Sequence, residues 1–124
     1  MASYAPGIVT VDRVGPSSWI VALQGEHDLT NSDRLRAELA TIFAQGTAVI
    51  LDLSAATFID SSIVKELIAA QERVDGVSTE QLAVVAPKDG FPRRVLDLLQ
   101  TYRVLHICED RHDALRLLEA GDAW

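Results

Sequence analysis

Cysteine is almost absent from this sequence, and its scarcity sets a first limit. Cys108 is the only cysteine among 124 residues, so no internal disulfide can form. The sequence also lacks a basic segment followed by an apolar signal core, and it has no uninterrupted apolar run of membrane-spanning length. We therefore expect a cytoplasmic protein that does not insert into a membrane.

Basic residues are the second shortage. Eleven Lys and Arg stand against 18 Asp and Glu, which gives a net charge of −7. A general attraction to phosphate backbones or anionic lipids is therefore not expected, and we predict no direct binding of nucleic acid. With 48% hydrophobic residues, the chain is long enough for one core and too short for two ordinary ones. A single domain over residues 1–124 is the resulting prediction.

Motifs that bind nucleotides or activate nucleophiles are also missing. The segment GFPRR at 90–94 has one glycine and no lysine–serine pair, so it is not a Walker-type phosphate loop. Ser61 and Ser62 lack the G-x-S-x-G elbow of many serine hydrolases. A phospho-accepting receiver domain built on Asp52 would need an acidic pair and a lysine where the sequence has VDRVG and HICEDR. Asp52 is instead predicted to make structural hydrogen bonds.

The three histidines show no spacing that specifies a metal site or a catalytic triad. His27, His106 and His112 lie far apart in the sequence, and we interpret each as a surface or half-buried structural residue. We therefore predict no catalytic residue, no cofactor and no bound metal, and we do not expect an enzyme.

What the sequence does contain is an alternation of strand and helix patterns. The runs IVTVDRV (8–14) and WIVALQG (19–25) are separated by four turn-forming residues, which predicts an antiparallel hairpin. Helical spacing follows in TNSDRLRAELATIF, with Thr30, Asn31 or Ser32 as the expected cap. The later strands are expected at 48–54, 82–87 and 104–108. The first helix is predicted to bury Leu35, Leu39, Ile42 and Phe43, and the second to bury Val64, Leu67, Ile68 and Gln71. The third is predicted to bury Val95, Leu98, Leu99 and Tyr102. The last helix is predicted over 112–121, ending at Gly121.

This order of elements predicts an α/β fold. An N-terminal hairpin followed by alternating strands and helices implies a mixed sheet whose later strands are parallel and joined by crossover helices. We expect about five strands and four helices.

The polar residues Asp60, Ser61 and Ser62 lie at the point where the second helix pattern begins. The ordinary interpretation is an N-cap, because an Asp or Ser oxygen there accepts a hydrogen bond from an unpaired backbone amide. A phosphate would also be favoured there by the helix dipole. It would add about −1.5 to −2 charges beside Asp60, enough to disrupt an interface. From the residues alone, both a cap and a phosphorylation switch are open.

Two longer segments carry a family resemblance. LQGEHDLTNSDRLRAEL, followed after a strand by VILDLSAATFIDSSIVKELIAA, resembles the STAS domain and in particular the small stand-alone anti-sigma factor antagonists. The G-E-x-D element of that family is matched at 25–28, its D-L-S element at 52–54, and its D-S-[ST]-G motif at 60–62. The resemblance covers most of the chain and implies a STAS-like fold.

The resemblance also implies a function. Ser61, with Ser62 as the less favoured acceptor, would be phosphorylated by an anti-sigma factor that is itself a serine kinase using ATP. The unphosphorylated protein would bind that partner and free a sigma factor for transcription, the phosphorylated protein would release it, and a phosphatase would reset the cycle. The partner-binding surface would comprise Asp28, Asp60, Ser61, Ser62, Ile63 and Val64. Ile63 and Val64 are candidates for an exposed apolar contact, and core or rim packing is their alternative role, which the helical spacing favours for Val64.

Two residues depart from the family pattern. Ile63 stands where the family usually has glycine, and a β-branched side chain there would add bulk where a kinase must dock. His27 replaces the usual apolar residue of G-E-x-D. Ile63 favours an alternative function, in which the chain is a non-phosphorylated STAS interaction subunit of a transport assembly or a stressosome-like scaffold.

Overall fold

Two paired strands open the fold, as the patterning predicts. The computed structural model describes residues 7–45, 48–77 and 81–119. In it, β1 (Ile8–Val14) lies antiparallel to β2 (Ser18–His27), and Val14 is opposite Ser18 at the turn. Gly15 has a φ of 78°, a left-handed conformation that glycine adopts without the steric cost of a Cβ atom. β2 extends past the predicted end of the hairpin and reaches His27.

The remaining strands form one mixed sheet with this hairpin. Its order is β1-β2-β3-β5-β6, where β3 is Ala48–Asp52, β5 is Gln81–Val85 and β6 is Ile107–Cys108, and these later pairs are parallel. A further strand, β4 (Ala56–Ile59), pairs in parallel with the last part of β2. The predicted α/β class with a mixed sheet is confirmed, and the described residues contain six strands rather than about five.

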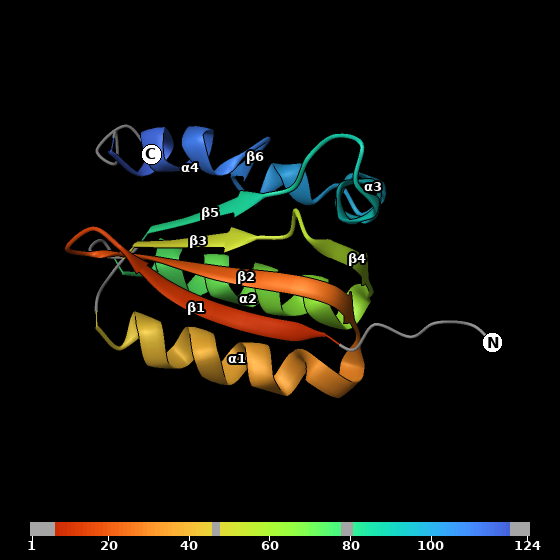
Figure 1. Cartoon of the computed structure of the whole chain (residues 1–124), viewed down its shortest axis with the longest axis horizontal. Coiled ribbons are helices and arrows are strands. Elements are labelled where there is room, and N and C mark those ends of the chain that lie inside the picture. Colours follow the sequence, from red (N-terminus) through yellow and green to blue (C-terminus); the bar gives the residue numbers. More distant parts are fainter. Residues whose placement is uncertain (1–6, 46–47, 78–80, 120–124) are drawn as a thin grey trace.

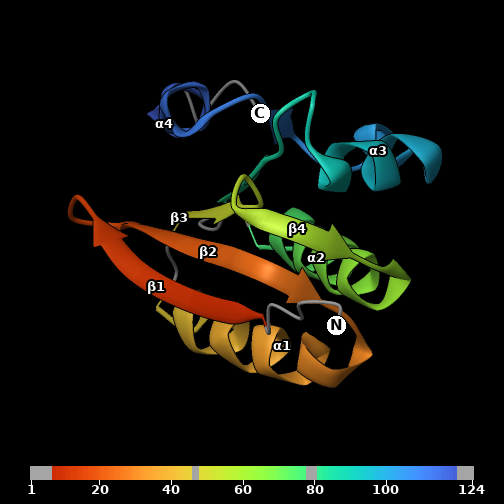
Figure 2. The ribbon, with the colours of Figure 1, turned by 45° about the vertical axis from the view of Figure 1, so that its right-hand side comes forward.

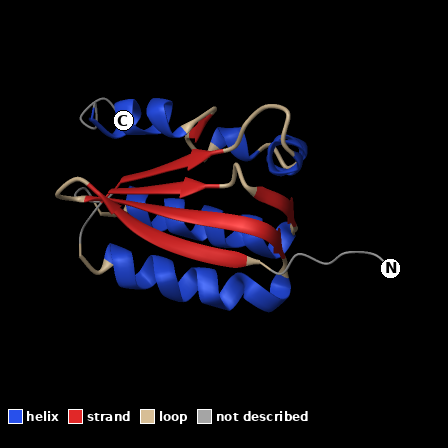
Figure 3. Cartoon of the chain, viewed as in Figure 1, coloured by secondary structure: helices blue, strands red, loops and turns tan. Residues whose placement is uncertain are grey.

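Four helices surround the sheet in two layers (Figure 1). α1 (Leu29–Phe43) and α2 (Ser61–Asp75) cover one face, and α4 (Arg111–Glu119) covers the other (Figure 3). α3 (Phe91–Leu98) lies against β4, beyond the end of the central strands (Figure 2). Within the described ranges, no helix combines the length and the apolar character needed to cross a bilayer.

The core explains why β3 and β5 are almost continuously apolar. Along β3, Val49 and Leu51 join the cluster under α1 and α2, whereas Ile50 joins the cluster under α4. A strand covered on both faces has no solvent side on which to place polar residues. The predicted apolar faces of the first two helices are confirmed, because those of α1 and most of α2 are buried in this core.

The predicted apolar face of the third helix is wrong at three of its four positions, because only Val95 packs against the core. α3 ends at Leu98, and the residues it buries are Pro92 and Leu96. Gln100 has a φ of 55°, so the helix cannot continue, and a short 3-10 helix η1 (Thr101–Arg103) follows in a new direction. The change of direction breaks the helical spacing, and Leu98, Leu99 and Tyr102 are left exposed.

The last strand is shorter than the patterning predicts. The strand expected over 104–108 is reduced to Ile107–Cys108, because the backbone is still completing the turn after η1 at Val104 and Leu105. The last helix is present as Arg111–Glu119. Its predicted end at Gly121 lies outside the described residues.

Asp52 connects the end of β3 to the start of α4. Its buried carboxylate accepts hydrogen bonds from the Ser54 amide at 2.8 Å, the Ser54 hydroxyl at 2.5 Å and Arg111 Nε at 2.5 Å. Burial by itself would raise the pKa of Asp52, but the hydrogen bonds from Ser54 and Arg111 hold the pKa below its usual range. These bonds agree with the structural role predicted for Asp52.

Replacing Asp52 by asparagine is expected to lower the free energy of unfolding by roughly 1–3 kcal/mol at neutral pH. Because the folded-state pKa of Asp52 is depressed, its stabilisation is present above the unfolded pKa of about 4 and is lost as the pH falls through the folded value. Urea titrations of wild type and Asp52→Asn should therefore converge below about pH 4. Asp12→Asn, at an exposed position of β1, is the control, and a wild-type advantage that persists undiminished at about pH 3 would contradict the assignment.

Candidate functional site

The predicted site lies where two neighbouring strands end and two helices begin. β2 and β4 are parallel, and His27 is paired with Ile59. The next residue on each strand is an aspartate, so Asp28 and Asp60 leave the sheet at the same edge. Each is the N-cap of the helix that follows, which places the starts of α1 and α2 beside each other (Figure 2). Strand register therefore brings two sequence motifs into one site.

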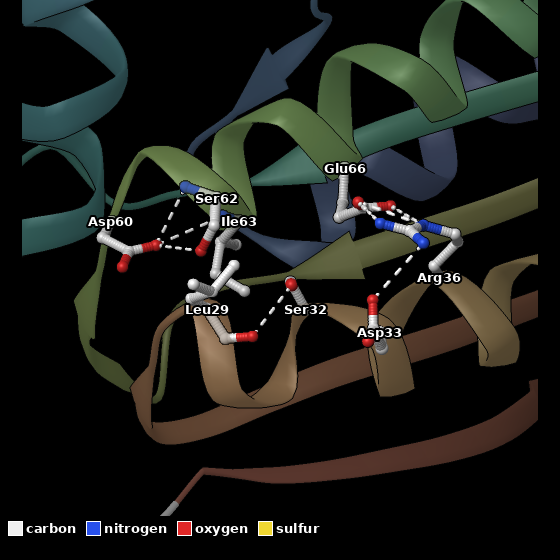
Figure 4. Close-up of polar contacts among 8 residues, drawn as sticks. All are labelled: Leu29, Ser32, Asp33, Arg36, Asp60, Ser62, Ile63 and Glu66. Atoms are coloured by element: carbon white, nitrogen blue, oxygen red, sulfur yellow. Dashed lines mark hydrogen bonds and ion pairs between the residues drawn. The ribbon is translucent and has the colours of Figure 1, made fainter.

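Asp60 organises the first turn of α2 and distinguishes the two serines. Its Oδ1 accepts from the Ser62 amide at 2.9 Å and from the Ile63 amide at 3.4 Å, and the Ser62 hydroxyl donates to the same oxygen (Figure 4). Ser62 is half-buried, and its hydroxyl already donates a hydrogen bond to Asp60. Ser61 is exposed, and its hydroxyl makes no hydrogen bond to any residue that the structure describes. Of the two hydroxyls, that of Ser61 is the accessible one.

Asp28 performs the same capping role for α1. Its carboxylate accepts from the Thr30 amide at 2.9 Å and the Thr30 hydroxyl at 2.5 Å, and its own amide donates to Asn31 Oδ1 at 2.8 Å. The Thr30 hydroxyl, followed by its amide, holds the pKa of Asp28 below the usual value, so this carboxylate is charged at neutral pH. Asp28, rather than a residue at 30–32, is the cap. The site thus carries two fixed negative charges.

The expected apolar contact surface is not formed by Ile63 and Val64. Ile63 is 0% exposed and Val64 is 3% exposed, because both face the core between α2 and the sheet. The burial has a second consequence: Ile63 adds no bulk to the surface above Ser61. The helical backbone at Ile63 does not need the conformational freedom of the usual glycine, so an isoleucine fits there without strain.

Exposed apolar side chains near the site come from other elements, which the sequence reasoning missed. Leu29, the first residue of α1, is 72% exposed. Phe58 of β4 and Phe91 of α3 are also exposed and stack on each other, with ring centroids 5.5 Å apart and an interplanar angle of 22°. These three residues form what we call the apolar rim. A helix-period pattern cannot reveal it, because the exposure of Leu29 and the stacking of Phe58 on Phe91 are set by tertiary packing.

An ion pair holds the two helices of the site together. Arg36 of α1 makes a two-pronged contact to Glu66 of α2, with distances of 2.7 Å from Nη2 to Oε1 and 3.1 Å from Nε to Oε2 (Figure 4). Asp33 lies 3.3 Å from Arg36 Nη1. Two parallel N–H to oxygen bonds restrain orientation as well as distance, so this contact links the middle of α1 to α2.

His27 is a structural residue of this region and is more deeply buried than predicted. The side chain is 0% exposed, and Nε2 donates to the Gln24 carbonyl at 3.0 Å. Nδ1 has no hydrogen-bond partner among the described residues. Burial lowers the pKa of His27, although the Gln24 and Ile8 carbonyls oppose that effect, so the ring is neutral at neutral pH. A Cβ at Gly7 would lie only 2.8 Å from His27 Cε1, so glycine is what fits against the ring.

The other histidines do not join this site. His106 precedes β6 and His112 lies on α4, and both are exposed. Among the described residues, no group of three or more His, Cys, Asp or Glu side chains is arranged to hold a metal ion. The predicted members that the structure does bring together are Asp28, Asp60, Ser61 and Ser62.

Solved structures share this fold. An anti-sigma factor antagonist from Mycobacterium paratuberculosis superposes with a TM-score of 0.83 at 24% identity, covering 94% of this chain and 99% of that one. The anti-sigma factor antagonist SpoIIAA in its unphosphorylated form has a TM-score of 0.74 at 18% identity, with 91% and 97% coverage. The Bacillus cell fate determinant SpoIIAA in its phosphorylated form has a TM-score of 0.67 at 18% identity, with 90% and 99% coverage.

Sequence comparison identifies the family. No curated protein sequence matches the chain significantly. The profile of the STAS domain, however, matches residues 6–114, which include both strand–helix junctions of the site and most of the secondary structure. The chain belongs to the STAS domain family.

Proposed function

We propose that this protein is an anti-sigma factor antagonist that works by partner switching. In its unphosphorylated form it binds an anti-sigma factor, which then releases a sigma factor for transcription. The anti-sigma factor is also a serine kinase that uses ATP to phosphorylate Ser61, and phosphorylation ends the interaction. A phosphatase restores the binding form. The chain acts in the cytoplasm as a substrate and regulator rather than as a catalyst.

The observation that carries this proposal is the contrast between the two serines. Ser61 is exposed on the first turn of α2 and has no hydrogen bond from its hydroxyl to a described residue. The Ser62 hydroxyl is engaged by Asp60. The cap of α2 is supplied by Asp60, so the helix does not need the Ser61 hydroxyl for its own stability. A kinase can therefore modify Ser61 without breaking an internal bond.

The charges around Ser61 explain how a phosphate would act as a switch. The phosphate would add about −1.5 to −2 charges to a surface that already carries the Asp28 and Asp60 carboxylates. The first turn of α2 tolerates this charge, because unpaired amides and the helix dipole favour an anion there. A partner that presents acidic or apolar groups would be repelled. Binding would change while the fold remains the same.

The apolar rim supplies the physical basis for binding in the unphosphorylated state. Leu29 and the stacked pair of Phe58 and Phe91 are exposed on elements that end or begin close to the sheet edge bearing Ser61. Exposed large apolar side chains that lie beside polar residues are a feature of protein interaction sites. In this proposal the rim takes the place that Ile63 and Val64 have in the sequence-based prediction.

The burial of Ile63 favours a phosphorylation switch over the alternative function as a non-phosphorylated interaction subunit. The argument for a non-phosphorylated transport or scaffold subunit is that a β-branched residue would obstruct a kinase. Ile63 is directed into the core, so this obstruction does not arise. Neighbouring structures add support, since one is an anti-sigma factor antagonist and another is a phosphorylated SpoIIAA.

Phosphate mapping in a native lysate tests the proposal. Tagged wild type, Ser61→Ala and Ser62→Ala are incubated with lysate of the source organism and ATP, and bound proteins and modified residues are identified by mass spectrometry. In a parallel incubation without ATP, we expect all three to retain an ATP-binding kinase. With ATP, we expect phosphate on Ser61 in wild type and in Ser62→Ala, none in Ser61→Ala, and continued retention of the kinase by Ser61→Ala alone. Retention of a transporter subunit or large scaffold, with Ser61 unmodified throughout, would instead support the alternative.

A further inference from the structure

A second group of exposed apolar side chains lies on α3 and η1, and none of its members belongs to the apolar rim. Its members are Leu98, Leu99, Tyr102 and Val104, which are 82%, 52%, 58% and 51% exposed. We call these four residues the α3–η1 patch. A single exposed leucine needs no explanation, but four large exposed apolar side chains within seven positions are a concentration of the kind that marks an interaction site.

The backbone under the patch is held rigidly. Thr101 is buried, and its hydroxyl donates to the Leu96 carbonyl at 2.9 Å. The Leu105 amide donates to the Thr101 carbonyl at 2.8 Å, and the Leu105 side chain is buried. Gln100 between these anchors has a φ of 55°, a left-handed conformation that is uncommon for a residue other than glycine. The polypeptide therefore turns sharply while its anchored residues face inward, and the four patch residues are kept at the surface.

The charge around the patch is opposite in sign to that of the whole chain. Residues 91–105 contain three of the 11 basic residues and only one of the 18 acidic residues. Arg93 is satisfied internally, because it contacts Asp97 at 3.3 Å, the Ala86 carbonyl at 2.9 Å and Glu109 at 3.9 Å. Arg94 and Arg103 are exposed and form no ion pair with a described residue. Two unpaired cations thus accompany the apolar patch.

We propose that the α3–η1 patch binds an acidic amphipathic helix of a partner protein. Leucines on one face of such a helix would cover Leu98, Leu99, Tyr102 and Val104, and its flanking carboxylates would pair with Arg94 and Arg103. An anionic membrane fits the patch less well, because the chain as a whole carries −7 charges and α3 has only eight residues. This surface does not include Ser61, so its occupancy is independent of the phosphorylation proposed above.

A designed peptide pair tests this surface with the full chain. The probe is a fluorescently labelled helix of roughly 18 residues with leucine at i, i+3, i+4 and i+7 and Glu and Gln elsewhere. The matched peptide has Lys in place of Glu. Anisotropy gives the dissociation constant for each, and amide shifts of ¹⁵N-labelled protein locate the contact. We expect the acidic peptide to bind more tightly than the basic one, with shifts centred on Leu98–Val104.

Three variants separate the contributions. Leu98→Asp is expected to weaken binding of the acidic peptide at least about tenfold, since it removes the most exposed apolar contact and adds a repelling charge. Arg103→Glu should reverse the preference between the two peptides. Leu29→Asp, which changes a leucine of the apolar rim that is 72% exposed, should leave peptide affinity within about twofold. All three positions are exposed, so the amide spectra should remain those of a folded protein.

Several results would overturn the proposal. These are absence of acidic-peptide binding at millimolar concentration, equal affinity for both peptides, or shifts that fall on the apolar rim. Adsorption to vesicles of phosphatidylglycerol, abolished by Leu98→Asp, would assign the patch to a lipid surface instead. Concentration-dependent dimerisation abolished by the same variant would assign it to a second copy of the chain. None of these results depends on Ser61, so the two proposals can fail separately.

Discussion

A glutamate at position 61 is expected to weaken binding to the anti-sigma factor by at least about 30-fold, which corresponds to near 2 kcal/mol. The added carboxylate would be the third negative charge at the edge where Asp28 and Asp60 cap their helices. Because Ser61 is exposed and caps nothing, the free energy of unfolding should change by no more than about 0.5 kcal/mol. Calorimetric titration with the partner measures the first quantity, and urea unfolding measures the second.

Two matched variants show whether charge is the cause. Ser61→Ala should bind the partner about as well as wild type and should not be phosphorylated. Ser62→Ala should also retain binding, because the Ser62 hydroxyl is turned toward the Asp60 carboxylate. Equal affinity of wild type and Ser61→Glu would count against a phosphorylation switch at this position. A loss of affinity in Ser61→Ala of the same size would show that the hydroxyl itself, rather than a negative charge, decides binding.

Restoring the family's glycine by Ile63→Gly is expected to destabilise this protein by roughly 3–6 kcal/mol. Ile63 is fully buried in the cluster that joins α1 and α2 to the sheet, so its removal leaves a cavity. Glycine near the start of α2 also adds the entropic cost of a flexible helical residue. Urea unfolding monitored by circular dichroism gives the change in free energy.

The two parts of this effect can be separated. Ile63→Val, which removes one methyl group, should cost about 0.5–1.5 kcal/mol. Lys65→Gly, at an exposed position of the same helix, should show the helix-propensity cost alone, about 1 kcal/mol. If Ile63→Gly were as stable as wild type, the Ile63 side chain would not be packed in the core, and the conclusion that it adds no bulk to the surface above Ser61 would be wrong.

Most of the fold could be predicted because its elements have local signals. Alternating β-branched residues indicate the hairpin, and the spacing of Leu35, Leu39, Ile42 and Phe43 indicates α1. β4 was missed because it is short and separated from β3 by only three residues, Leu53–Ala55, so the two strands have the pattern of one apolar run followed by a helix. Leu98, Leu99 and Tyr102 are predicted to be buried but are exposed, because nothing in the spacing signals the left-handed backbone at Gln100.

The site was predictable where it is contiguous in sequence and not where it depends on tertiary packing. The capping role of Asp60 is visible from the residues that follow it. The exposure of Leu29 and the stacking of Phe58 on Phe91 are not, because they depend on how β4, α1 and α3 are placed. The Asp52–Arg111 pair is separated by 59 positions, and only the parallel sheet brings its partners together.

The pairing of His27 with Ile59 has a further consequence for how such a protein can diverge. The spacing between the starts of α1 and α2 is determined by hydrogen bonds between β2 and β4, not by the length of the polypeptide between them. Insertions in the connection from α1 to β3 would leave Asp28, Asp60 and Ser61 in the same relation. A single-residue insertion within β4 would instead reverse the inward and outward positions that follow it and turn Ser61 away from the site. Sequence change is therefore tolerated in the connections and restricted at the four residues of β4, because these determine the position of Ser61.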